Sequence, residues 1–76
     1  MSEYIEFRDA GTSPSGKTRV WNVVTKPGGY IIGKIAWWAA WRRYALHPED
    51  GSVFEQDCLR TIASFCETET QEHKGK

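Results

Sequence analysis

An apolar stripe with the spacing of an α-helix runs through the last third of the chain. Its members recur at intervals of three and four residues: Phe54, Cys58, Leu59, Ile62, Phe65 and Cys66. Ser52 precedes Glu55 by three positions, which is the pattern of a capping box, so we expect a helix over about residues 53–67. Such a helix buries only one face and needs another layer of structure to pack against.

The residues before this helix favour strands. Residues 4–8 alternate apolar and charged side chains, and residues 18–25 are rich in β-branched and aromatic types. Turn-forming residues occupy positions 9–16, which predicts a loop between these two strands. Lys26-Pro27-Gly28-Gly29 then predicts a tight reversal into a third strand that starts at Tyr30.

The stretch from residue 35 to residue 47 admits two interpretations. Its alanines, arginines and leucine favour helix slightly, and its aromatic residues lie at helical spacing. As strands, the chain would form two runs, 30–38 and 41–47, which reverse at Ala39-Ala40. Propensity alone leaves both interpretations open.

Aromatic, arginine and aliphatic residues follow a distinctive pattern between residues 28 and 66, about half of the chain: Gly33-x-Ile35-x-Trp37, Trp41-Arg42-x-Tyr44, Pro48, Val53-Phe54, Cys58-Leu59 and Ile62-Ala63-x-Phe65. In this pattern the chain resembles a family of small uncharacterised proteins from bacteria and phages. The resemblance implies two strands between residues 30 and 47, because family members carry a turn dipeptide at the positions of Ala39 and Ala40. It implies no established activity, and it points to a phage or another mobile element as the source.

We therefore predict an α+β fold, a four-stranded antiparallel β-meander with one C-terminal α-helix packed on one face. Residues 1–67 would form this single small domain. Residues 68–76 are predicted to be a polar, frayed tail, because no apolar residue follows Cys66.

The aromatic and basic residues of the third and fourth strands form the candidate site. The side chains expected under the helix are Ile35, Trp37, Tyr44 and Leu46. The residues expected to bind a partner are Lys34, Trp38, Trp41, Arg42 and Arg43. Desolvated Trp and Arg anchor protein interfaces, and the same groups can stack on bases and contact phosphates. The alternative interpretation is that the tryptophans simply fill a small core.

Charge is unevenly distributed, although the formal net charge is zero. Residues 1–48 carry seven basic and three acidic groups, and residues 49–76 carry three basic and seven acidic ones. The pI of about 6.7 argues against a strong phosphate footprint, so we expect a protein partner and only weak nucleic-acid binding. An apolar outer face and two unpaired sheet edges also predict a homodimer.

Residues Gly11–Thr18 match the phosphate-binding expression G-x-x-x-x-G-K-[ST]. A working P-loop follows a buried parallel strand and precedes a helix whose N-terminus completes the anion site. Here a β-rich run follows Thr18, and no apolar run ending in Asp supplies a second metal-binding motif. We interpret the match as coincidental and expect neither ATP nor GTP to bind.

The remaining reactive residues do not form a catalytic or metal-binding pattern. Cys58 and Cys66 lie eight positions apart on the expected helix, about 12 Å, which exceeds the reach of a disulfide. His47 and His73 do not give them the spacing of a zinc site, so we expect no metal, no other cofactor, no enzymatic activity and no small-molecule substrate. No window fits a membrane span and the acidic N-terminal residues do not fit a secretory signal, which predicts a cytoplasmic protein.

Overall fold

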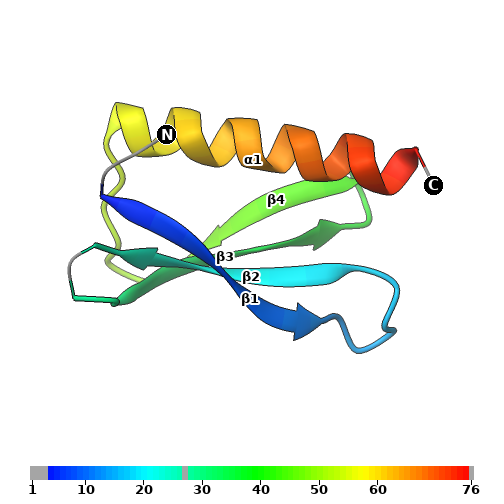
Figure 1. Ribbon diagram of the computed structural model, residues 1–76, viewed down its shortest axis with the longest axis horizontal. Coiled ribbons are helices and arrows are strands. Elements are labelled where there is room, and N and C mark those ends of the chain that lie inside the picture. Colours follow the sequence, from blue (N-terminus) through cyan, green and yellow to red (C-terminus); the bar gives the residue numbers. More distant parts are fainter. Residues whose placement is uncertain (1–3, 27, 76) are drawn as a thin grey trace.

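Four strands follow one another along the chain and pair antiparallel in the same order, β1-β2-β3-β4. The elements are β1 (Ile5–Thr12), β2 (Arg19–Thr25), β3 (Ile31–Trp38), β4 (Arg43–Pro48) and the helix α1 (Gln56–Lys74). The computed structural model describes residues 4–26 and 28–75, and in it α1 lies along one face of the twisted sheet (Figure 1). The predicted α+β meander with a C-terminal helix is confirmed.

The core lies between the sheet and α1. Its buried members come from all the strands and from the helix: Ile5, Trp21, Val23, Ile35, Tyr44, Cys58 and Ile62. The Trp21 ring meets Tyr44 and Phe65 edge-on, with centroids 5.4 and 4.9 Å apart, which is a favoured geometry for aromatic pairs. Leu59 was expected on the buried stripe, but it is exposed, because the helix turns its Cys58–Ile62 side to the sheet.

Strand β1 is longer than predicted, since residues 9–12 were expected to belong to a loop. Asp9 pairs with Trp21 and Thr12 pairs with Arg19, across a bulge between them. Gly11 has a φ of 97°, and its N–H donates to Asp9 Oδ1 at 2.7 Å. The turn-forming residues between Asp9 and Thr12 therefore form a β-bulge, and strand β1 continues beyond the position at which their propensity predicts a loop.

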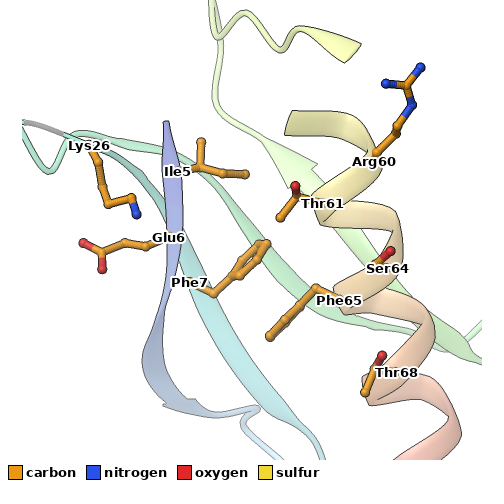
Figure 2. Close-up of a pocket in the computed structure, with 9 residues that line it drawn as sticks. All are labelled: Ile5, Glu6, Phe7, Lys26, Arg60, Thr61, Ser64, Phe65 and Thr68. Carbon is orange, nitrogen blue, oxygen red and sulfur yellow. The ribbon is translucent and has the colours of Figure 1, made fainter. Parts of the chain in front are cut away.

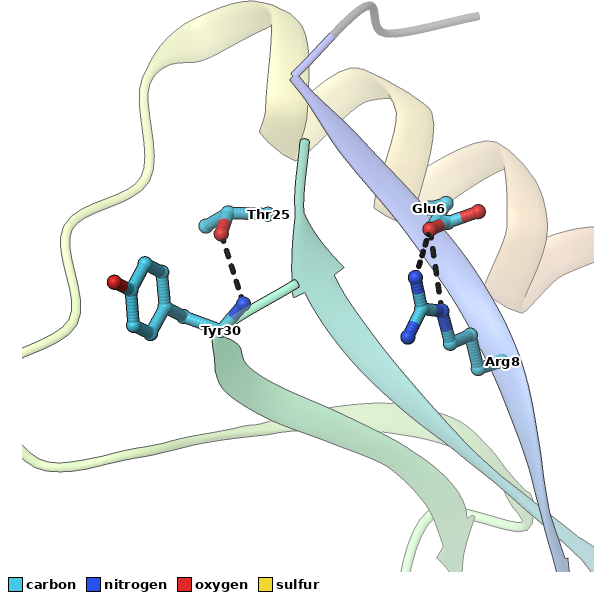
Figure 3. A network of polar contacts seen from close by, with 4 residues as sticks. All are labelled: Glu6, Arg8, Thr25 and Tyr30. Carbon is cyan, nitrogen blue, oxygen red and sulfur yellow. Dashed lines mark hydrogen bonds and ion pairs between the residues drawn. The ribbon is translucent and has the colours of Figure 1, made fainter. Parts of the chain in front are cut away.

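The stretch of ambiguous propensity, residues 35–47, belongs to two paired strands and not to a helix. Residues 39–42 form the turn between them. The preceding reversal contains Pro27, which lies outside the described residues. Gly28 and Gly29, which follow Pro27, have φ values of 108° and 68°. Tyr30 N donates to Thr25 Oγ1 at 3.1 Å (Figure 3).

Both ends of α1 differ from the prediction. Glu55, not Ser52, is the N-cap residue, and its carboxylate accepts a hydrogen bond from Cys58 N at 2.6 Å. The helix then continues through Lys74, so the expectation of a frayed tail was wrong for residues 68–74. Lys76 lies outside the described residues.

Two polar residues explain why the helix continues. Thr70 Oγ1 accepts a hydrogen bond from Tyr44 N at 3.0 Å, and the His73 ring lies 4.5 Å from the Trp37 ring. These side chains occupy the face of α1 that continues the apolar stripe, but they are polar, so hydrophobic spacing does not reveal them. The last turns of α1 are held by contacts with the β3–β4 hairpin.

Candidate functional site

The β3–β4 hairpin carries the residues that were predicted to bind a partner. Trp38 ends β3 and pairs with Arg43, which begins β4, so their side chains share one face of the sheet. Trp37 and Tyr44 pair on the opposite face, beneath the helix, as predicted. Lys34 has the same parity along β3 as Trp38, and it is exposed. Lys34, Trp38 and Arg43 therefore lie on the outer face.

The turn over residues 39–42 places Trp41 beside Trp38. Trp41 N and Arg42 N both donate to Trp38 O, at 3.2 and 2.9 Å. The two indole rings lie 5.9 Å apart with their planes tilted by 56°, and the residues are 43% and 65% exposed. Arg43 Nε donates to Trp41 O at 3.3 Å. We call Lys34, Trp38, Trp41 and Arg43 the outer patch.

His47 belongs beside the outer patch and was not identified from the sequence. It pairs with Lys34 across the two strands, and its ring lies 5.8 Å from that of Trp38. Its Nε2 is shielded from solvent and has no hydrogen-bond partner among the described residues. The sequence pattern could have identified it, since the alternation of side chains along β4 through Arg43 and Ala45 puts His47 on the outer face.

Arg42 lies apart from the other predicted site residues. It occupies the last position of the turn with a φ of 55°, a left-handed conformation that costs a residue with a side chain about 1–2 kcal/mol. Together with Trp37, His73 and Lys74 it lines a hollow of about 500 Å³ beside the end of α1. The outer patch therefore contains two cationic side chains and not three.

The P-loop-like segment connects two antiparallel strands. Ser13 N donates to Thr18 O, and Gly16 N donates to Ser13 O, both at 2.8 Å. Strand β2 follows Thr18, whereas a P-loop requires a helix there to complete the anion site. The glycines serve a hairpin connection, as Gly16 shows with its φ of 74°.

A groove of about 720 Å³ separates β1 from α1, and the sequence did not indicate it. Figure 2 shows Ile5 and Phe7 on the helix side of β1 and Glu6 on the other side. The Phe7 and Phe65 rings stack in the groove with centroids 4.1 Å apart and planes 15° apart. Because α1 packs chiefly against β4, the side of the helix nearest β1 is left open. Thr61 is among the helix residues that line it.

Cys58 and Cys66 both lie on α1, and neither belongs to a disulfide. Burial, with a smaller effect of the neighbouring Glu67, raises the pKa of Cys66 from 9.0 to about 11. The Cys66 thiol is therefore protonated at neutral pH and is a poor nucleophile. Within residues 4–26 and 28–75, no cluster of three or more His, Cys, Asp or Glu is placed to hold a metal ion, and no helix has the length and apolar character to cross a membrane.

Comparison with known proteins identifies a relative among phage proteins. No family model and no solved structure matches the chain. An "uncharacterized 9.3 kDa protein" of Acholeplasma phage L2 is 33% identical over 73 residues, which cover 96% of this chain and 92% of the relative. The similarity thus extends over nearly the whole of both proteins, and it agrees with the expected link to phages. The chain belongs to the same family as this 9.3 kDa protein of Acholeplasma phage L2.

Proposed function

We propose that this protein is a non-catalytic interaction module, encoded by a phage or another mobile element, that binds a protein partner through the outer patch. The observation that carries the proposal is the pair of tryptophans at the tip of the β3–β4 hairpin. Their rings lie 5.9 Å apart, yet the residues remain 43% and 65% exposed. Trp and Arg are enriched among the few residues that contribute most of the binding energy at protein interfaces, and here they lie exposed side by side. Covering the rings recovers roughly 25 cal/mol for each Å² of apolar surface.

The charges of the outer patch indicate the chemistry of the partner. Lys34 and Arg43 take part in none of the ion pairs found among the described residues. Both cations are therefore available to acidic side chains around an apolar centre, and such complementarity selects the partner and speeds association. His47 Nε2, which is shielded and unpaired within the described chain, offers one more polar contact to a partner that reaches beneath Trp38.

Nucleic acid is the alternative ligand, and the charge balance supports it less well. Stacking of bases on Trp38 and Trp41 would contribute about 1–3 kcal/mol for each base. Phosphate contacts by Lys34 and Arg43 would give a slope of only about −1.4 to −1.8 in a plot of log K against log salt. The formal net charge of zero supplies no long-range attraction to phosphates. Affinity should therefore be no tighter than tens of micromolar at physiological salt, as a rough expectation for nonspecific contact.

The test is affinity capture from a lysate of the cells that carry the gene for this chain, with quantitative comparison of three baits. The wild-type chain should retain a protein that the Trp41→Ala/Arg43→Ala double variant loses. The matched control is Tyr30→Ala/Lys17→Ala, which removes an exposed aromatic and an exposed cation outside the outer patch and should retain the same protein. Circular dichroism should show that all three baits are folded.

Two outcomes would contradict the proposal. One is capture of the same proteins, in the same amounts, by wild type and by the Trp41→Ala/Arg43→Ala variant. The other comes from titration with single- and double-stranded oligonucleotides at physiological salt. Sub-micromolar binding that the double variant loses would make nucleic acid the ligand of the outer patch.

A further inference from the structure

The two edge strands of the sheet, β1 and β4, differ in what lies beside their outer backbone groups. Along β4, Thr70 of α1 accepts the hydrogen bond of Tyr44 N at 3.0 Å, and α1 packs chiefly against this strand, so the helix blocks that edge to another strand at Tyr44. Along β1, the side of α1 leaves a groove and no element of the described chain pairs with the outer edge. Of the two edge strands, β1 is therefore the more open to pairing with another strand.

The register shows which backbone groups β1 presents at its free edge. Tyr4 O accepts the hydrogen bond of Lys26 N at 2.8 Å, so the backbone of Tyr4 faces β2. In an antiparallel pair the hydrogen-bonded positions alternate, so Glu6 and Arg8 also face β2. The N–H and C=O groups of Ile5, Phe7 and Asp9 consequently point away from the sheet.

We propose that β1 pairs antiparallel with β1 of a second copy of this chain, about a two-fold axis at Phe7. The two four-stranded sheets then join into one continuous sheet across a homodimer. Phe7 of each copy exchanges N–H···O=C hydrogen bonds with Phe7 of the other. Ile5 of one copy pairs in the same way with Asp9 of the other.

Charge complementarity supports this register. Glu6 lies opposite Arg8 of the second copy at a non-hydrogen-bonded position, where opposed Cα atoms are only ~4.5 Å apart. Within one chain Arg8 Nη2 and Nε already lie 2.7 and 3.1 Å from Glu6 Oε1 (Figure 3). The dimer therefore assembles four alternating charges on the outer face, each with opposite charges as neighbours.

The neighbouring registers are disfavoured by the same side chains. Moving the axis to Glu6 sets two glutamates opposite each other, and moving it to Arg8 sets two arginines opposite each other. Like charges directly opposite destabilise a strand pair. Charged residues on an edge usually deter foreign strands, but here they are complementary to themselves in one register.

The groove supplies the apolar part of the interface. Phe7 and Phe65 stack on the helix side of β1 and line the open groove (Figure 2). When two β1 strands pair at Phe7, both phenylalanines and both grooves lie beside the same axis. The aromatic side chains of each copy then cover those of the other, which removes apolar surface from water.

The dimer gives the protein two outer patches on one face. A two-fold axis perpendicular to the sheet keeps the outer faces of both copies on the same side. Five strand spacings separate the two β3 strands, which is about 24 Å. A partner with repeated sites would then be held at two points, which raises its apparent affinity without any new contact.

Charge reversal and sedimentation equilibrium test the proposal. The wild-type chain should have a mass of twice 8.7 kDa at high concentration. Glu6→Arg and Arg8→Glu should each weaken dimerisation about tenfold or more, because each sets like charges opposite at two symmetric positions. The double variant Glu6→Arg/Arg8→Glu restores opposite charges and should return to within about threefold of wild type. Glu49→Arg makes the same charge change beyond the end of β4 and should have no effect.

Amide hydrogen exchange tests the register itself. The Ile5 and Phe7 amides should be slowed at high protein concentration and fast at low concentration. The Glu6 amide faces β2 and should be protected at both. Thermal unfolding of dilute samples separates loss of dimer from loss of fold, since an exposed Glu6–Arg8 pair contributes little to the monomer.

Three results would overturn the proposal. The first is a wild-type monomer up to about 500 µM, where even a weak specific dimer would be populated. The second is a dimer that the single charge reversals leave intact. The third is a dimer that Trp38→Ser/Trp41→Ser dissociates while Glu6→Arg does not, which would place the contact on the outer patch. None of these results depends on whether the outer patch binds another protein.

Discussion

Deletion of residues 68–76 should destabilise the fold, although this segment contains no apolar residue. The perturbation removes the part of α1 that lies against the β3–β4 hairpin. Tyr44 N loses its acceptor, Thr70 Oγ1, which lies 3.0 Å away. Trp37 and Tyr44 lose the His73 ring, at 4.5 and 6.2 Å.

The size of the effect can be worked out from these contacts. The hydrogen bond contributes about 1 kcal/mol. The ring contacts contribute about 0.5–1.5 kcal/mol, and partial exposure of Tyr44 costs about 1 kcal/mol more. The sum is about 3 kcal/mol, set against roughly 4–11 kcal/mol of total stability for a domain of this size. The truncated chain should therefore still fold, with a Tm lower by roughly 12–24 °C.

Urea denaturation followed by tryptophan fluorescence and far-UV circular dichroism measures the difference. A full-length pair separates the hydrogen bond from the deletion itself. Thr70→Val removes the acceptor and should cost about 1 kcal/mol, whereas Thr70→Ser keeps it and should cost much less. If truncation changes the free energy of unfolding by less than about 0.5 kcal/mol, the contacts of the last turns contribute nothing and the reasoning fails.

Further predictions concern single residues. Glu55→Ala should lower the urea midpoint clearly more than Ser52→Ala, because Glu55 is the N-cap residue. The hydrogen bonds from Cys58 lower the pKa of Glu55, so the stability that its carboxylate contributes is full above pH 4.5 and is lost as the pH falls through its pKa in the folded state. Urea denaturation at pH 7 and at pH 3 would show this loss. Gly33→Ala should destabilise by about 1–3 kcal/mol in the same assay, because a Cβ there lies 3.1 Å from both a carbonyl oxygen and a methyl group of β4. Because the pKa of Cys66 is raised from 9.0 to about 11, its thiol should react with a thiol reagent at pH 8 about a hundredfold more slowly in the folded chain than in the unfolded chain, and equal rates would contradict this. The free energy of unfolding should also decline as the pH rises from about 9 to 11, because the thiol ionises first in the unfolded chain. Calorimetry should detect no ATP or GTP binding, and micromolar binding that Lys17→Ala abolishes would show that the loop does hold phosphates.

The sequence by itself determined the first half of β1, the second strand and most of the turns, whereas only the tertiary structure decided that residues 35–47 are strands and not a helix. Once those residues are strands, their alternation also determines the sides on which Trp37 and Trp38 lie. Alternation along a strand is a local property, and so is the freedom of the glycines that permit the reversal after β2. For the same reason the outer placement of Lys34 and Arg43 could be predicted, and His47 could have been added by extending the alternation of β4.

Only the tertiary structure decided the ends of the helix, the position of Arg42 and the difference between the two edges of the sheet. Thr70 and His73 hold the last turns of α1 through Tyr44 and Trp37, residues more than twenty positions away, so no local pattern reports them. The groove beside β1 exists because α1 packs nearer to β4 than to β1 on the same face of the sheet. No local pattern in the sequence determines which of these two strands the helix lies against. Local spacing selects the face of an element that is buried. Packing against distant elements selects where the element ends and which edge is left open.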